Sequence, residues 1–248
     1  MKIGIIVEAR TLSTRLPGKV LLKINKKTIL EYLIERLKKI RKADSIIIAT
    51  TKKKIDESII KIAKKNNVKY FRGSENNVLD RVVKAATINS IDVIVRVTSD
   101  CPIIDVNIID QAISIFLNNN CDFVSNGFVR SYPDGMDVEV FRTKTLVKSL
   151  MYVKNNQDKE HITLAIRKNS HIFKHLNLIA PMNQYWPELG LTLDEINDFK
   201  LIKKLINFFY KKNKFFSCLD IINILKKKKE WVLLNSHTKR TVYNYGAK

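Results

Sequence analysis

The sequence predicts an α/β fold with a mostly parallel central sheet and helices on both faces. From residue 2 to 124, short apolar runs alternate with segments whose apolar residues repeat at helical spacing, which is the pattern of βαβ units. The short runs are rich in Ile and Val, as strands of a buried parallel sheet are. With 248 residues and 45% hydrophobic content, the chain can bury a sizeable core and sits where a single α/β domain usually ends.

The first half of the chain contains the clearest elements. Five strands are expected, at residues 2–7, 45–50, 68–71, 92–97 and 122–124. Helices are expected between them, and the first is the best defined because its apolar and charged residues fall on opposite faces. Its apolar face is formed by Ile29, Leu30, Leu33, Ile34, Leu37 and Ile40. Thr28 is expected to cap this helix, with Glu31 three residues later.

After residue 123 the alternation becomes less regular, which we interpret as an insertion or a substrate-facing half. A turn is expected at residues 132–135. The elements predicted next are a strand at 136–141, helices at 143–153 and 159–169, and strands at 171–179 and 189–193. Apolar residues then predict two terminal helices, around Ile196 to Ile206 and Leu219 to Leu225.

Composition restricts the class of protein. The three cysteines, Cys101, Cys121 and Cys218, lack C-x-x-C spacing and are expected to be free thiols. No apolar stretch approaches the ~20 residues of a membrane span, and no signal-peptide pattern opens the chain, so a cytoplasmic protein is expected. The net charge of +21 would suit nucleic acid, an anionic membrane or a polyanionic substrate. Lysine runs such as 52–54 and 226–229 are expected to be solvated surface.

The loop after the first strand has the composition of an anion-binding site. Residues 8–19 place Arg10, Arg15 and Lys19 between a buried strand and the first helix, together with hydroxyls and a glycine. Backbone N–H groups and guanidinium forks of such a loop match the oxygens of a polyphosphate. The alternative is a solvated basic loop. Neither Walker A spacing nor a G-x-G-x-x-G fingerprint is present, which weakens ATPase and dehydrogenase interpretations.

Two aspartates follow other predicted strands. Asp100 stands at the end of a central strand, where a carboxylate is costly to bury without a cation or donors, and magnesium is its natural partner. Helix capping is the alternative for Asp100, but Asp105 is better placed to cap the helix that begins near Val106. Asp194 opens the third loop, and it could share a metal with Asp100 or cap the next helix.

The residues of the first loop carry a resemblance to a known family. The run Ala9-Arg-x-x-Ser-Thr-Arg-Leu-Pro-Gly-Lys-Val-Leu21 resembles the signature of the sugar-acid cytidylyltransferases, which act on 3-deoxy-manno-octulosonate and acylneuraminates. Further matches are 71–75, 78–81, 100–105, 132–141, 160–163 and 191–199. They are similar to the spore-coat polysaccharide biosynthesis F-type branch, over Met1 to about Leu225.

The resemblance implies a Rossmann-like nucleotidyltransferase fold, usually homodimeric, in which a sugar hydroxyl attacks the α-phosphorus of CTP with Mg²⁺ and pyrophosphate leaves. It implies one domain over 1–248, with a nucleotide-binding half at 1–125, a sugar-facing half at 126–195 and C-terminal helices at 196–248. The implied nucleotide-binding residues are Ala9, Arg10, Ser13, Thr14, Arg15, Lys19, Ser74, Arg81 and Asp100. The implied catalytic residues are Arg15, Lys19 and Asp100. The implied metal ligands are Asp100 and Asp194. The residues expected to face the sugar are Asp137, Glu139, Glu160 and His161. For His161, a buried and satisfied histidine is an equal alternative.

The chain departs from the family pattern at three places. Glu8 stands where Gln or Pro is common, Ser99 replaces a frequent Gly, and Glu195-Ile196 replace a frequent Thr-Pro. An extra carboxylate at Glu8 is expected to repel CTP unless it binds a second metal or pairs with an arginine.

Two other functions compete with this interpretation. One is the same fold with another nucleotide, as in a uridylyl- or guanylyltransferase, or with an acceptor that is not a sugar acid. The other is a non-catalytic nucleic-acid-binding protein, suggested by the pI near 9.8. No nucleic-acid partner is expected, because the aromatic residues fall largely in apolar periodic positions and are not interleaved with basic ones.

Overall fold

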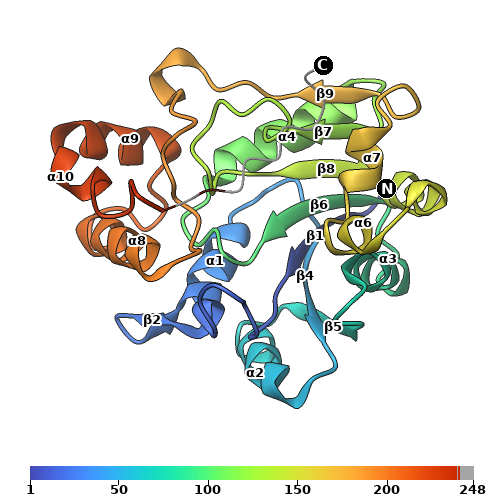
Figure 1. Ribbon diagram of the computed structural model, residues 1–248, viewed down its shortest axis with the longest axis horizontal. Helices are drawn as coiled ribbons and strands as arrows, with labels where there is room; N and C mark the ends of the chain where they lie inside the picture. The colour runs from blue at the N-terminus through green and yellow to red at the C-terminus, as the bar shows by residue number, and fades with distance from the viewer. Residues whose placement is uncertain (239, 241–248) are drawn as a thin grey trace.

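A computed structural model describes residues 1–238 and 240, and the remaining residues of the predicted C-terminal part, 239 and 241–248, lie outside the description. The described chain forms a seven-stranded sheet in the order β5-β4-β1-β6-β8-β7-β9 (Figure 1). Its strands are β1 (Ile3–Glu8), β4 (Ser45–Thr51), β5 (Lys69–Gly73), β6 (Val93–Thr98), β7 (Phe123–Ser125), β8 (Glu139–Arg142) and β9 (His175–Asn177). Only β8 runs antiparallel to its neighbours among these strands, so the predicted mostly parallel sheet is confirmed.

Helices cover both faces of the sheet. They are α1 (Ile29–Leu37), α2 (Glu57–Lys65), α3 (Val78–Ile88), α4 (Val106–Asn118), α5 (Thr143–Ser149), α6 (Asn156–Glu160), α7 (Leu164–Lys168), α8 (Ile196–Phe209), α9 (Cys218–Lys227) and α10 (Lys229–Val232). Short 3₁₀ helices occupy Lys19–Leu21, Lys54–Asp56, Leu150–Tyr152 and Met182–Gln184, and a small hairpin joins β2 (Lys23–Ile24) to β3 (Lys27–Thr28). The capping box of Thr28 and Glu31 at the start of α1 is confirmed.

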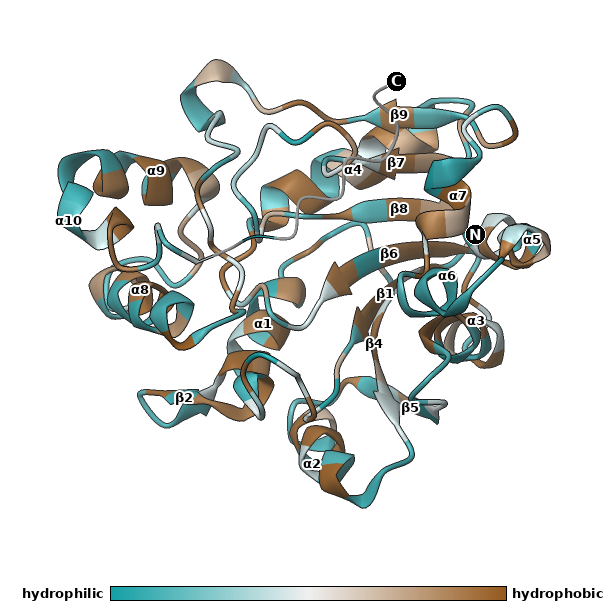
Figure 2. Ribbon diagram, in the orientation of Figure 1, coloured by the Kyte–Doolittle hydropathy of each residue, from teal (hydrophilic) through white to brown (hydrophobic). Residues whose placement is uncertain are grey.

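Two hydrophobic clusters lie on opposite faces of the sheet. Successive strand residues alternate between them: Val93 and Val95 belong to the larger cluster and Ile94 to the smaller one. The larger cluster packs α1, α4, α8 and α9 on one face, and the smaller one packs α3, α5 and α7 on the other. Figure 2 shows the result as apolar colour on β1 and β7 and hydrophilic colour on exposed parts of α2 and α8. Burial on both faces explains why the first strands read as apolar runs.

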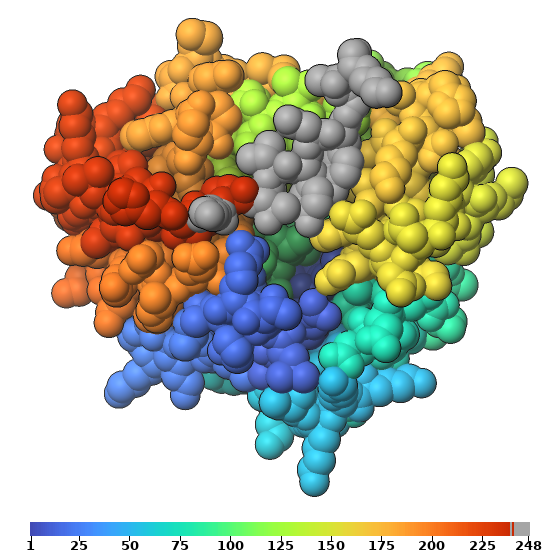
Figure 3. All heavy atoms as spheres, in the orientation of Figure 1, coloured from blue at the N-terminus to red at the C-terminus, as the bar shows by residue number. Residues whose placement is uncertain are grey.

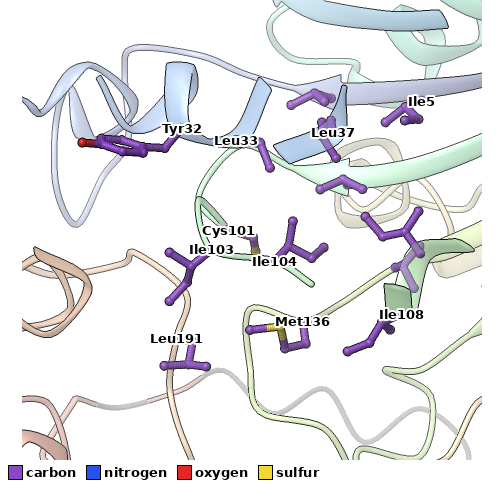
Figure 4. Close-up of a cluster of buried hydrophobic side chains, with 14 of the residues drawn as sticks. Ile5, Tyr32, Leu33, Leu37, Cys101, Ile103, Ile104, Ile108, Met136 and Leu191 are labelled. Atoms are coloured by element: carbon purple, nitrogen blue, oxygen red, sulfur yellow. The ribbon is translucent and has the colours of Figure 1, made fainter. Parts of the chain in front are cut away.

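The loop after β6 turns into the core. Cys101, Ile103 and Ile104 are buried and point toward α1, Met136 and Leu191 (Figure 4). These apolar contacts hold the backbone that follows Asp100, whose carboxylate lies beyond the end of β6. The three cysteines are free thiols, as predicted.

Several predicted elements of the second half are wrong in extent. Residues 189–193 do not form a strand, and only one bridge joins Asp134 to Gly190. The strand predicted at 171–179 shrinks to β9, and the one predicted at 136–141 starts only at Glu139. The helix predicted at 159–169 is divided into α6 and α7 by residues 161–163. In the described part of the chain, no helix combines the length and apolarity that crossing a membrane requires.

Candidate active site

Three loops meet at the edge of the sheet where β1 and β6 end. They are the segments 9–18, 99–105 and 190–195, and Leu193 N–H donates to the Asp100 carbonyl oxygen at 2.8 Å, which joins the second loop to the third. A first cavity of about 400 Å³ opens here. Figure 3 shows a hollow in the surface between the blue N-terminal atoms and the yellow atoms near residue 160. A ligand site at the carboxyl ends of parallel strands agrees with the general rule for open α/β sheets.

Asp56 fixes the shape of the first loop, residues 9–18, by a hydrogen bond to its backbone. Its carboxylate accepts the Thr11 N–H at 2.7 Å and also the Thr51 hydroxyl. Gly18 N–H donates to the Thr11 carbonyl at 2.8 Å and closes the loop. Gly18 has φ +71°, a left-handed conformation that is costly for residues with a Cβ. The loop therefore presents its side chains from a fixed backbone.

Lys19 and Arg15 meet the two predicted metal ligands. Lys19 Nζ lies 2.7 Å from Asp100 Oδ2 and 3.0 Å from Asp194 Oδ1. Arg15 reaches the same Asp194 oxygen at 2.8 Å. The structure thus brings together four residues that lie up to 179 positions apart in the sequence, as their numbers 15 and 194 show.

Attraction between these charges keeps the cluster ionised. Burial alone would lower the pKa of Lys19 and raise that of Asp100. The opposite charges and hydrogen bonds outweigh burial, so the pKa of Lys19 is raised and the pKa of Asp100 is lowered.

The donor set fits magnesium bound together with a substrate. Asp100 and Asp194 converge on a single ammonium, so their oxygens are close enough to share one small cation. Within the described residues, no group of three or more His, Cys, Asp and Glu side chains could enclose a metal ion by itself. Mg²⁺ is commonly held by one or two carboxylates, with substrate phosphates and water completing the shell.

Helix capping does not explain either aspartate. Asp105 is the N-cap of α4, where its side chain accepts the Asn107 N–H. Glu195 is the N-cap of α8 and forms a capping box with Asp198. Neither Asp100 nor Asp194 caps a helix, and their carboxylates instead bind the cations Lys19 and Arg15.

A buried chain of ion pairs runs behind the cluster. Arg96 contacts Glu8 at 2.6 Å on one side and Glu139 at 2.9 Å on the other, and Arg167 also pairs with Glu139. Burial would raise the pKa of Glu139, but Arg167 and Arg96 overcome this effect and lower it to about 2. The extra carboxylate of Glu8 is thus neutralised by an arginine, one of the two outcomes that the sequence allowed.

A second cavity of about 320 Å³ adjoins the first. The two share six lining residues, Arg15, Arg96, Thr98, Asp100, His161 and Asp194. The second cavity extends toward Asp134, Asp137 and Arg130. Arg130 contacts both carboxylates at 3.3 and 3.2 Å. Burial first, and then the charge of Asp137, raises the pKa of Asp134 to about 7.

The residues implied by the resemblance divide between the two cavities. Ala9, Arg10, Ser13, Thr14, Lys19, Arg81 and Glu160 line the first, Asp137 and Glu139 the second, and Arg15, Asp100, Asp194 and His161 both. Glu160 therefore lines the first cavity and not the second, and it pairs with Arg10 at 3.3 Å. Half-buried His161 borders both spaces, and burial lowers its pKa.

Ser74 is the exception, because it lines neither cavity. Its hydroxyl accepts the Asn77 N–H, and its carbonyl accepts a hydrogen bond of 2.6 Å from Arg81. The side chain of Arg81 is buried, and its Nε has no hydrogen-bond partner among the described residues. Ser74 thus shapes the loop beside Arg81.

Sequence reasoning missed seven polar residues of the second cavity, which are Arg96, Thr98, Arg130, Asp134, Thr163, Arg167 and Thr192. Arg96 had a visible signal, because it is a charged residue inside an apolar strand. The others gave no such signal in the local sequence, although Asp134 and Asp137 lie only four and seven positions after Arg130, which contacts both.

Known proteins resemble this chain over nearly its whole length. A cytidylyltransferase family model matches residues 4–235. An uncharacterized protein of Methanocaldococcus jannaschii is 40% identical over 243 residues, 98% of each chain. The spore coat polysaccharide biosynthesis protein SpsF of Bacillus subtilis is 33% identical over 205 residues, 81% of this chain and 84% of that protein. A solved structure of a cytidylyltransferase from Leptospira borgpetersenii has a TM-score of 0.89 at 36% identity, covering 98% of this chain and 99% of the other. The chain therefore belongs to the cytidylyltransferase family, on a branch with SpsF, and is a nucleotidyltransferase that transfers CMP from CTP.

Proposed function

We propose that this enzyme transfers CMP from CTP to a hydroxyl group of a sugar acid, with Mg²⁺ held by Asp100 and Asp194. The observation that carries the proposal is the pair of adjoining cavities that share Asp100, Asp194 and Arg15. The first cavity would hold the nucleotide and the second the acceptor. The α-phosphorus and the attacking hydroxyl would then meet at the shared residues.

The first cavity supplies cations for the triphosphate. Arg10, Arg15 and Lys19 line this cavity, and Ser13 and Thr14 add hydroxyl donors. The bond between the α-phosphorus and the oxygen that links it to the β-phosphorus breaks, a new bond from the acceptor oxygen to the α-phosphorus forms, and the proton of the acceptor hydroxyl passes to water. Arg15 and Lys19 would stabilise the charge that accumulates on the departing pyrophosphate. Arg81 also lines this cavity and would add a further positive charge near the nucleotide.

Magnesium, when bound, would lower the pKa of the acceptor hydroxyl and align it for in-line displacement. The chain's own contribution is to orient the reactants, because nucleotidyl transfer depends mainly on positioning and charge neutralisation. Arg96 borders both substrate spaces, and its ion pairs with Glu8 and Glu139 keep it in one orientation.

A sugar acid suits the polar lining of the second cavity. Asp134 and Asp137 offer acceptors for sugar hydroxyls, and Arg130 and Arg167 offer donors for a carboxylate. The similarity to SpsF supports a role in polysaccharide biosynthesis. An acceptor from another class, such as a polyol phosphate, remains the second candidate, because the same arginines would bind a phosphate.

Pyrophosphate release tests the reaction. The protein is incubated with Mg²⁺, each of the four common nucleoside triphosphates, and sugar acids beside their neutral counterparts. Release is expected only with CTP and an acidic acceptor, and Asp100→Asn should reduce it by about 10²-fold or more. Asp80→Asn, which removes the half-buried partner of Lys84 on α3, is the matched control. Equal release with neutral sugars or phosphates would contradict the sugar-acid assignment.

We further propose a homodimer formed along the β9 edge of the sheet. Exposed apolar side chains gather on β9 and on the segments beside it, at Val129, Leu176, Ile179, Met182 and Tyr185. Val129 N–H donates to the Asn177 side chain at 3.0 Å, which ties the first of these segments to β9. Light scattering on the wild type and on Ile179→Glu is expected to show a dimer and a monomer, respectively; a wild-type monomer would contradict this proposal.

A further inference from the structure

Lys19 lies where the two predicted metal ligands converge. Its ammonium contacts Asp100 at 2.7 Å and Asp194 at 3.0 Å, and its side chain is only 12% exposed. We propose that Lys19 holds the place of the divalent cation in the free enzyme and moves to the triphosphate when metal and CTP enter together. This inference rests on the proposed magnesium site.

The charges of the cluster support such a replacement. Asp100 and Asp194 are balanced by Lys19 and Arg15, so the free site is already neutral. A dication added alone would leave two positive charges in excess in a partly buried place. A triphosphate brings the negative charges that Lys19 and Arg15 can then meet. Metal binding should therefore depend on the nucleotide.

The local structure allows Lys19 to change partners. Lys19 follows Gly18 at the start of the 3₁₀ helix and lines the first cavity with Ser13 and Thr14. A lysine is a compact point charge on a flexible stem, so rotation of the side chain alone can redirect the ammonium. Arg15 is less suited to this role, because it contacts Asp194 alone and its side chain is 42% exposed.

Manganese binding to the nucleotide-free protein tests the inference without measuring activity. The probe is Mn²⁺ alone, titrated by calorimetry or electron paramagnetic resonance into wild type, Lys19→Met and Lys19→Gln. Both variants remove the competing ammonium and should bind Mn²⁺ about 10-fold tighter or more. Lys53→Met, which removes an exposed partner of Glu75, controls for the general loss of one positive charge and should bind as wild type does.

A second titration includes a non-hydrolysable CTP analogue. The analogue should tighten Mn²⁺ binding in wild type far more than in Lys19→Met. If the folded Lys19 variants bind Mn²⁺ no more tightly than wild type, the inference is wrong, although the magnesium site stands. If Asp100→Asn and Asp194→Asn leave Mn²⁺ binding with the analogue unchanged, the proposed magnesium site fails as well.

Discussion

Glu139 should make a large and pH-dependent contribution to stability. It is 3% exposed, and it accepts hydrogen bonds from Arg96, Arg167 and the Thr163 hydroxyl. A fall of its pKa from 4.5 to about 2 corresponds to about 3 kcal/mol of folding free energy. Replacing it by Gln should therefore cost about 3 kcal/mol at pH 7, or roughly 6–12 °C in Tm for a chain of this size.

The sign of the pH dependence follows from the depressed pKa. The contribution of Glu139 is fully present above its unfolded-state pKa of 4.5 and is lost as the pH falls toward about 2. Urea unfolding of wild type and Glu139→Gln between pH 7 and pH 3 should show a constant difference above pH 4.5. Below it, the difference should shrink by about 1.4 kcal/mol per pH unit.

Glu160→Gln is the matched control for this measurement. Its side chain is 55% exposed and forms one ion pair of 3.3 Å with Arg10, so the change should cost less than about 1 kcal/mol. Two results would refute the reasoning: a Glu139→Gln protein within about 1 kcal/mol of wild type at pH 7, or a difference that does not change below pH 4.5.

Four further substitutions have expected outcomes in stability. Gly18→Ala should cost about 1 kcal/mol through the left-handed backbone, since no atom lies within 4 Å of the added Cβ; an unchanged Tm would contradict this. Asp134→Asn should stabilise the protein by on the order of 2 kcal/mol at pH 8, because the raised pKa of about 7 makes ionisation costly in the fold. This gain should shrink as the pH falls toward 4, and a gain independent of pH would count against it. Asp198→Ala should cost about 3 kcal/mol and Asp220→Ala about 1 kcal/mol in chemical denaturation, because both complete capping boxes but only Asp198 is fully buried and paired with Arg240; equal costs would contradict this reasoning.

The sequence predicted the first half of the fold well because local patterns decide it. Strands buried on both faces appear as apolar runs, and α1 shows its buried face and its cap directly. Residues 189–193 misled the prediction for a physical reason. Leu189, Leu191 and Leu193 alternate and are buried, but their backbone bonds to loops at Asp134 and Asp100 instead of a neighbouring strand. The sequence shows that alternate residues are buried, but it does not show which backbone groups their own backbone will bond to.

The sequence predicted candidate site residues only where they belong to a recognisable motif. The motif singled out the loop 9–19 as a candidate site, and the structure brings Lys19 of this loop to both aspartates. The ion pairs of Arg96 join residues 88 and 43 positions away, and nothing in their local sequence announces the partners. The magnesium ion, the sugar acid and the dimer stay predictions.

Because β8 runs in the reverse direction, the two cavities are lined by different kinds of segment. The loops of the first cavity leave strands β1 and β6, whereas the segment that carries Asp134 and Asp137 enters β8. Because β8 is antiparallel to β6, with Glu139 opposite Arg96, its incoming segment reaches the same rim as the outgoing loops. The sequence of residues 127–138 could therefore change during evolution while that of the segment 9–19 is kept. Such a change would alter the acceptor of the enzyme and leave its nucleotide substrate the same.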